Sequence, residues 1–554
     1  MIQMIDAKRL GRFSGIEFGK KDVSIVLFAA AISGVFLILY GETKNMVFLI
    51  IAAASAVMLM GIFLKPVLER DNKKNNINSN IPFFITAFAT LSVSAANRID
   101  IIELLSKKDK LGFVKDDMAK LVNLVKNWKR GLSEAAMFLS QRTPSEVFAD
   151  FLARFGHAID SGQDFEEFVR DEAGTVMSNF ETTYISSLYT FDLYKDMYIS
   201  LLLAFAFLIT FILIMPILIP INIIAVLSLS MITIIMGEAL LVYGIKIVLP
   251  NDPIWHDTGI KTELQLKIRK IFIMAGVLSM VLLTALLATG LALKIPFYFD
   301  VAIVITPFAW PGIVGSREEK KITKKDDMFG SFIRSLAGSA SARGNMIIEA
   351  LKSIVLHDFG SLTRDIRNLY KRLTYRINNK EAWRNFSAET GSHLIEVFSE
   401  SFVESVELGA DAEKAGLVVA DNFDKVIRLR KRRHSSVASY VGVIYGITGG
   451  LAFSLAISYG VLEIISKVFA TLDVSSLQDF GIFVAQPPSE LLIIEMFIVA
   501  ILFLHSFVAG TALKIADGGR VAHSLHHAVI MIWIVSFVIY GTLQVVVLML
   551  GGGL

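Results

Sequence analysis

Two sets of charged residues in this sequence have a spacing that could bind a partner. Four glutamates follow one another at helical intervals: Glu396, Glu400, Glu404 and Glu407. On a helix they form one acidic row, and because like charges four residues apart repel each other, the row indicates a basic neighbour. A basic stripe elsewhere in the chain could supply that neighbour internally: Arg364, Arg367 and Lys371. An external partner is the open alternative.

The second set is a basic run directly before an apolar segment: Arg428, Arg430, Lys431, Arg432 and Arg433. Cations at the end of a membrane span bind anionic lipid headgroups, which accounts for part of this run. Its density exceeds what orientation in a membrane requires. We therefore hypothesise that the acidic row and the basic run together bind a cytoplasmic protein.

Sequence patterns for catalysis and cofactor binding are missing. There is no G-x-x-x-x-G-K-S/T phosphate loop, no G-x-S-x-G turn and no H-E-x-x-H zinc motif. Cysteine is absent, which excludes thiolate metal ligands and thiol nucleophiles, and a net charge of +3 does not favour nucleic acid. His523, His526 and His527 lack a nearby carboxylate, so they indicate an interfacial turn rather than a metal site. The sequence predicts no catalytic, cofactor or metal site, and no enzyme.

A few ionisable residues lie inside apolar segments, where a charge costs several kcal/mol. Glu238 and Asp300 are the main candidates for an intramembrane polar site, followed by Glu495 and His505. Asp300 is close to the start of its segment and could reach water. The alternative role for these residues is helix packing.

The elements that position these residues are mostly apolar. Hydrophobic residues make up 54% of the chain, and the mean hydropathy is +0.59. Apolar runs of about 20 residues can cross a membrane as helices. We predict nine such runs, at 23–40, 45–64, 197–219, 221–245, 271–293, 295–314, 437–465, 491–513 and 528–550. The polar parts show no strand-like alternation, so the predicted fold is an all-α, polytopic membrane protein with about nine transmembrane helices and two cytoplasmic helical-bundle domains.

The placement of Lys and Arg predicts the orientation. They concentrate in the short segments on the side of the N-terminus, which puts the N-terminus and both large polar blocks in the cytoplasm and the C-terminus outside. A polar stretch at 72–80 predicts a linker. The predicted domains are an N-terminal segment and span hairpin (1–64), a first cytoplasmic helical domain (65–196, the first block), four spans with a short cytoplasmic loop at 246–270 (197–314), a second cytoplasmic helical domain (315–436, the second block) and three spans (437–554).

The two blocks resemble each other at a constant offset of 248 residues. Both have a helix, a break marked by glycine, a charged helix and a Phe-rich helix, and each is followed by a hydrophobic hairpin. The sequence therefore indicates an internal duplication. The matching pairs are Phe84 and Phe332, Asn97 and Asn345, Gly112 and Gly360, Asp117 and Asp365, and Leu121 and Leu369.

The stretches RTPSEVFADFLARFGHAIDSGQDFEEF and FIRSLAGSASARGNMIIEALKS, with RLRKRR before a span, carry a family resemblance. The chain resembles the platform proteins of type IV pilus and type II secretion machines, and most of all their archaeal branch, the archaellum (archaeal flagellum) platform family called flagellar assembly protein J. The likeness covers roughly 80–245 and 329–513. The extra spans fit the archaeal branch.

The resemblance implies a non-enzymatic scaffold in the cell membrane at the base of a motility filament. Its expected partners are a cytoplasmic hexameric ATPase, pilin-like filament subunits (archaellins), the lipid bilayer and a second copy in a homodimer. The rival hypothesis is a secondary transporter or channel with large cytoplasmic loops. A transporter needs several polar groups converging at mid-membrane, whereas these spans are almost free of charge.

Overall fold

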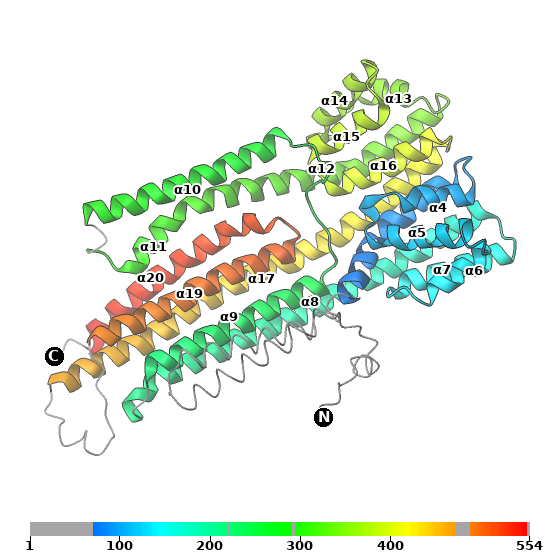
Figure 1. Ribbon diagram of the computed structural model, residues 1–554. Coiled ribbons are helices and arrows are strands. Elements are labelled where there is room, and N and C mark those ends of the chain that lie inside the picture. Colours follow the sequence, from blue (N-terminus) through cyan, green and yellow to red (C-terminus); the bar gives the residue numbers. More distant parts are fainter. Residues whose placement is uncertain (1–69, 220–221, 291–293, 472–487, 551–554) are drawn as a thin grey trace, which may run out of the picture. The chain divides into compact units, whose positions relative to one another are not determined.

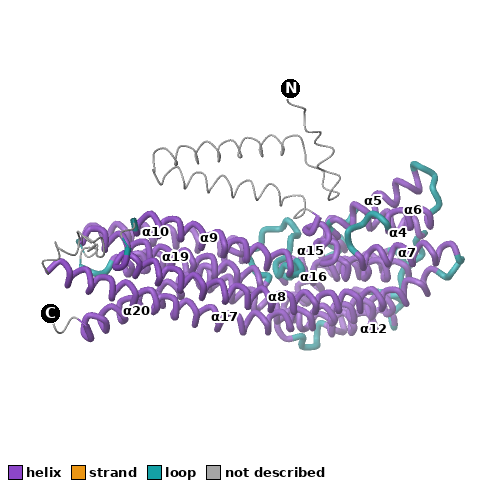
Figure 2. Tube along the Cα trace, turned by 90° about the horizontal axis from the view of Figure 1, so that it is seen from below, coloured by secondary structure: helices purple, strands orange, loops and turns teal. Residues whose placement is uncertain are grey.

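The computed structural model describes residues 70–219, 222–290, 294–471 and 488–550, and every regular element within them is a helix (Figure 1, Figure 2). This confirms the predicted all-α fold. The chain forms two compact units, Met1–Asn75 and Asn76–Leu554. Only residues 70–75 of the first unit are described, and all contacts below lie within the second unit.

The first block begins with a helix at residues 70–92. Short helices follow: α4 (Arg98–Ser106), η2 (Asp109–Leu111), α5 (Phe113–Lys126), α6 (Leu132–Ser140) and α7 (Glu146–Asp160). The prediction of a linker at 72–80 is wrong, because this stretch is helical. Its polar side chains bond to neighbouring segments, as when the Asn76 side chain accepts the backbone N–H of Phe113 at 3.0 Å.

The second block is built from helices in the same order. They are α12 (Ala309–Ser341), α13 (Ile347–Ile354), η5 (Gly360–Leu362), α14 (Thr363–Thr374), α15 (Asn379–Thr390) and α16 (His393–Glu407). α8 (Phe165–Leu218) leaves the first block and α17 (Ala412–Thr471) leaves the second.

The boundaries of these helices support the duplication. A glycine with positive φ precedes or opens the third helix of each block, a serine caps the helix before the exit, and an aspartate accepts the first-turn N–H of the exit helix. The 248-residue offset shortens by one residue between the glycines and the serines. The equivalent pairs are Gly112 and Gly360, Ser145 and Ser392, and Asp164 and Asp411.

Seven helical stretches in the described residues are long and apolar enough to cross a membrane. They lie in α8, α9 (Ile223–Val248), α10 (Glu263–Thr289), α11 (Phe297–Ile305) with η4 (Thr306–Phe308) and α12, α17, α19 (Pro488–Asp517), and η6 (Val521–Ser524) with α20 (Leu525–Leu550). Each overlaps one of the last seven predicted spans. The predicted spans at 23–40 and 45–64 lie outside the described residues.

Three helices extend across the boundary between a polar block and an apolar span. These are α8, α12 and α17, and the proposed domain boundaries at 196, 314 and 436 fall inside them. The boundaries therefore mark a change of environment along one helix.

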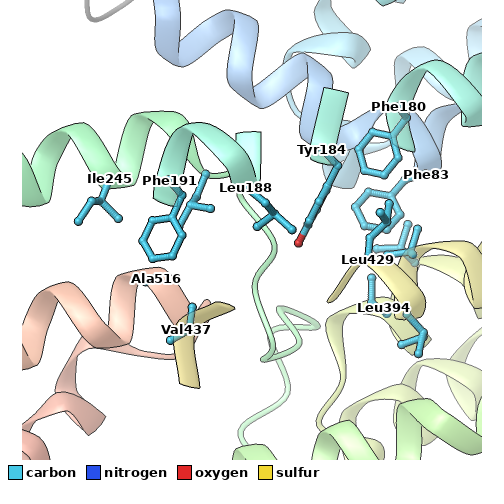
Figure 3. Close-up of a cluster of buried hydrophobic side chains, with 14 of the residues drawn as sticks. Phe83, Phe180, Tyr184, Leu188, Phe191, Ile245, Leu394, Leu429, Val437 and Ala516 are labelled. Atoms are coloured by element: carbon cyan, nitrogen blue, oxygen red, sulfur yellow. The ribbon is translucent and has the colours of Figure 1, made fainter. Parts of the chain in front are cut away.

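The membrane helices pack around α17, which contacts α8, α12, α19 and α20 (Figure 1). α9 packs on both α8 and α19. Figure 3 shows one buried cluster where the blocks meet the spans, with Leu188 of α8, Ile245 of α9, Val437 of α17 and Ala516 of α19. The hydrophobic core is continuous from the blocks into the apolar spans.

Candidate functional site

The connection between α9 and α10 binds both blocks. Residues 249–258, here called the strap, follow α9 in an extended path. The backbone N–H of Asn251 donates to the Ser79 hydroxyl of the first block at 2.8 Å. Further on, the N–H of His256 donates to the carbonyl of Gly391, and the N–H of His393 donates to the carbonyl of Ile254, both at 3.0 Å. The strap therefore joins the first block to the turn between α15 and α16.

Arg430 is buried at the centre of this junction, with 2% of its surface exposed. Its Nε donates to Oδ2 of Asp252 in the strap at 2.8 Å, and its Nη1 donates to Oδ2 of Asp326 on α12 at 2.9 Å. Burial alone would raise the pKa of the Asp252 carboxyl, but the Arg430 guanidinium lowers it below its ordinary value. The planar guanidinium fork thus ties α17 to the strap and to α12.

Arg433 is also buried and binds backbone carbonyls. It donates to the carbonyl oxygens of Pro250 at 2.8 Å, Ala516 at 2.7 Å and Ile515 at 3.1 Å. The last two belong to the C-terminal end of α19, where a cation is favourable. Arg433 therefore holds the strap and the end of α19 against α17.

The basic run is thus divided between the inside and the outside of the molecule. Arg428, Lys431 and Arg432 are exposed, and Lys431 forms an ion pair with Asp327 at 2.8 Å. The hypothesis that the whole basic run binds a cytoplasmic protein is corrected, because Arg430 and Arg433 are buried. A signal was present in the sequence, because both arginines continue the apolar helical stripe of Val426, Leu429 and Val437.

The acidic row on α16 pairs inside the chain. Glu396 is buried, accepts the N–H of Asp257 at 2.9 Å and lies 2.8 Å from Nζ of Lys110 in the first block. Burial favours the neutral acid, but hydrogen bonds from His393, Lys110 and the Asp257 backbone lower the pKa of Glu396 to about 2.

The rest of the row follows the same pattern. Lys108 of the first block forms an ion pair with Glu404 and lies 3.6 Å from Glu400, which is exposed. Glu407 is exposed and accepts a hydrogen bond from Asn379 at 2.8 Å. The internal cations of the row are therefore Lys108 and Lys110 rather than the stripe at Arg364, Arg367 and Lys371, whose side chains are exposed on α14.

A cavity of about 520 Å³ lies beside the row. η2, the strap, α15 and α16 all line it, with side chains of both charges that include Asp109, Lys110, Arg384 and Glu400. Arg384 donates to the carbonyl of Thr258 at 3.1 Å, and Lys110 pairs with Glu396. The cavity therefore lies between the two blocks, and its lining contains both paired and exposed charges.

The two intramembrane candidates have different surroundings. Glu238 on α9 is buried, and its Oε1 lies 2.9 Å from Nδ1 of His505 on α19. Asp300 on α11 is half-buried, and its Oδ1 has no hydrogen-bond partner in the described residues. Glu238 and His505 were each predicted as ionisable groups in a span, but their pairing was not.

The three C-terminal histidines have separate partners. Nδ1 of His523 lies 2.7 Å from Oε1 of Glu319, so the absence of a nearby carboxylate holds only in the sequence. Nδ1 of His526 contacts the carbonyl of His523 at 2.7 Å, and Nδ1 of His527 contacts the Tyr445 hydroxyl at 2.6 Å. The Glu319 carboxylate also accepts from the indole of Trp255 at 3.0 Å, which connects this turn to the strap.

Comparison with known proteins places this architecture in a family. The family model described as type II secretion system (T2SS), protein F matches residues 84–213, which cover most of the first block and most of α8. Flagella accessory protein J of Methanocaldococcus jannaschii is 35% identical over 535 residues, covering 95% of each chain.

The chain belongs to the flagella accessory protein J family. The protein of the same name from Methanococcus voltae is 34% identical over 498 residues, covering 88% of this chain and 89% of the relative. No solved structure matches. The second block, the structural repeat of the first, lies outside the residues that the secretion family model matches.

Proposed function

We propose that this protein is the membrane platform of an archaellum-type filament machine. It anchors a cytoplasmic motor ATPase and transmits the movements of that ATPase to filament subunits in the membrane. The observation that carries the proposal is the identity of 35% over nearly the whole length of a flagella accessory protein, together with the match to a secretion-system component. ATP hydrolysis is assigned to a separate chain, because this one has no phosphate-binding loop.

The continuous helices supply a physical route for such movement. α8 has 54 residues and α17 has 60, so at 1.5 Å per residue they are about 80 and about 90 Å long. Each begins in a polar block and ends as a membrane span. A displacement of either block is therefore passed directly to the packed spans α9, α19 and α20.

The proposed topology has both blocks in the cytoplasm and the C-terminus outside. Exposed cations lie at the ends of the apolar stretches of α10 and α12 that are nearer to the blocks. They are Lys267, Arg269, Lys270, Arg317, Lys320 and Lys321. Because the chain has no cysteine, single cysteines report their location without interference. Gln163→Cys and Ser361→Cys should resist a membrane-impermeant thiol reagent in intact cells, whereas Lys294→Cys should be labelled. Labelling at 163 or 361 would reject the topology.

The proposed binding surface for the ATPase comprises the exposed members of the two charged sets: Glu400, Glu407, Arg428, Lys431 and Arg432. Exposed charges mainly set association rate and salt sensitivity. Wild-type binding to the purified hexameric ATPase should weaken with added salt, and replacing Arg428, Lys431 and Arg432 with Ser should weaken it further. A matched control replaces Arg364, Arg367 and Lys371 with Ser, which removes the same charge from α14.

The platform function itself is tested by genetics and co-purification. Deletion of the gene should abolish filaments while the filament subunits and the ATPase are still made. The purified protein should retain the ATPase and form a homodimer, and it should hydrolyse no ATP alone. Filaments in the deletion strain, or solute transport by the purified protein in vesicles, would overturn the proposal in favour of the transporter alternative.

A further inference from the structure

The two repeats meet along parallel helices, in the blocks and in the spans. α8 packs on α17 and α9 packs on α19. Near-equivalent positions of the repeats face each other along the first pair, where Lys414 contacts Glu166 at 3.2 Å and Ser458 contacts Thr210 at 3.3 Å. The second pair, α9 and α19, carries the ionisable contact of Glu238 with His505. This contact therefore lies between a helix of each repeat.

The contact lies well inside the apolar layer. Glu238 is about 15 Å along α9 from Val248 at 1.5 Å per residue, and its side chain is 1% exposed. The His505 side chain is 2% exposed. A single charge at this depth costs several kcal/mol, so each group depends on the other for any charge it carries.

The hydrogen bonds around the pair define where its protons are. Oγ1 of Thr448 on α17 lies 2.8 Å from the carbonyl oxygen of Ile444, 3.5 Å from Sδ of Met531 and 3.1 Å from Nε2 of His505. The hydroxyl hydrogen is assigned to the shortest contact, the Ile444 carbonyl, which leaves the oxygen to accept from Nε2. On this assignment Nε2 carries a hydrogen. On the other side, Tyr198 of α8 donates its hydroxyl to Oε2 of Glu238 at 3.3 Å. One further hydrogen must lie between Nδ1 and Oε1 to make the 2.9 Å contact.

We propose that Glu238 and His505 form an intramembrane proton-binding site that holds one proton and joins the two repeats through it. The two tyrosines beside it on the neighbouring helices, Tyr198 on α8 and Tyr440 on α17, are buried phenols that remain neutral. With its proton, the pair is electrically neutral as a whole and holds α9 against α19. Separating the helices would leave the carboxyl and the imidazole apart in an apolar layer, each without a partner for a charge.

The site is tested with dicyclohexylcarbodiimide, an apolar reagent that adds to protonated carboxyl groups in membranes and leaves a stable N-acylurea. The full-length protein in lipid nanodiscs is treated at pH 7, and adducts at individual residues are measured by mass spectrometry. Asp300 is the internal reference, since it is half-buried and its Oδ1 has no hydrogen-bond partner in the described residues. In the wild type we expect at least tenfold less labelling at Glu238 than at Asp300.

Variants separate protonation from reagent access. His505→Gln removes the partner, so Glu238 should become protonated and its labelling should rise about tenfold while Asp300 labelling is unchanged. The exchange of the pair, Glu238→His with His505→Glu, should leave the carboxyl at position 505 protected. Wild-type labelling of Glu238 equal to that of Asp300 would overturn the proposal, and so would continued protection in His505→Gln. Equal wild-type labelling of Glu238 and Asp300 overturns the proposal even if a variant fails to fold.

Discussion

The two blocks share one helical order and the same capping residues but differ in what covers them. α7 and α16 are equivalent Phe-rich helices. The face of α16 that carries Glu396, Glu400 and Glu404 packs against the strap and the lysines of the first block. The equivalent positions of α7 are Ala149, Ala153 and His157. These three acidic positions are therefore a feature of the second repeat alone and serve the contact between the repeats, whereas Glu407 is matched by Asp160.

The exit helices diverge in the same way. Arg430 and Arg433 of α17 hold the strap, whereas the equivalent positions of α8 are Thr183 and Ser186. In the loop after the second helix, the contact belongs to the first block instead. The Lys108 side chain packs against α16 and is 9% exposed, whereas its equivalent in the second block, Leu356, is 85% exposed. The duplicated helices thus retain the fold. The charged residues that differ between the repeats form the contacts between the two blocks and the strap.

The largest expected effect comes from removing the contact of Arg430 with the strap, which has no equivalent in the first repeat. Arg430→Met leaves the carboxylates of Asp252 and Asp326 buried without their cation, which should cost about 3–5 kcal/mol. We expect loss of folded protein in detergent, measured by size-exclusion chromatography and melting temperature. Arg432→Met, an exposed neighbour, and Thr183→Met, the equivalent site of α8, should change stability by less than about 0.5 kcal/mol. If Arg430→Met and Arg432→Met lose the same amount of stability, the buried contacts of Arg430 with Asp252 and Asp326 do not stabilise the fold.

The next largest loss of stability is expected from a substitution where α12 and α17 pack closely. A Cβ on Gly416 would lie 2.1 Å from Cβ of Ala337, whereas the equivalent position on α8 is Val169. Gly416→Ala should destabilise the second block by about 1–3 kcal/mol through overpacking.

A compensating change keeps this prediction specific. Ala337→Gly should recover much of the melting temperature when combined with Gly416→Ala. A double variant as unstable as the single one would show that the effect is not the contact between α12 and α17.

Removing the lysines that bridge the blocks should have a smaller effect. Lys110→Ala leaves Glu396 with His393 and the Asp257 N–H, so the expected cost is about 1–2 kcal/mol. Limited proteolysis of the loops between the blocks and the melting temperature report the change. Lys107→Ala, whose side chain is 68% exposed, is the matched control and should be neutral. If Lys107→Ala has the same effect, the bridge between the blocks contributes nothing.

The smallest effect is a dependence of this bridge on pH. The pKa of Glu396 is lowered from 4.5 to about 2, so its contribution is fully present above pH 4.5 and is lost as the pH falls toward 2. The wild type should therefore exceed Glu396→Gln in melting temperature at pH 7, and the difference should shrink between pH 4.5 and pH 2. A difference that does not vary with pH would show that Glu396 contributes by packing alone.

The sequence by itself determined the features that depend on neighbours along the chain. Apolar runs predicted the seven spans that fall in described helices, because a helix in lipid must satisfy its backbone internally and cover its length with apolar side chains. The pairs Gly112 and Gly360, and Phe84 and Phe332, predicted the repeat because each requires a similar local structure. The absence of a phosphate loop is likewise a local property.

Only the tertiary structure decided which charges are paired and which are free. Arg430 and Asp252 are 178 residues apart, and Glu238 and His505 are 267 apart, so no helical period relates them. A basic run reads as a uniform surface in sequence, but a helix turns through 100° per residue and places Arg430 inside and Arg428 outside. The partner of each buried charge is set by which helices pack together, and that packing is determined by the whole apolar core.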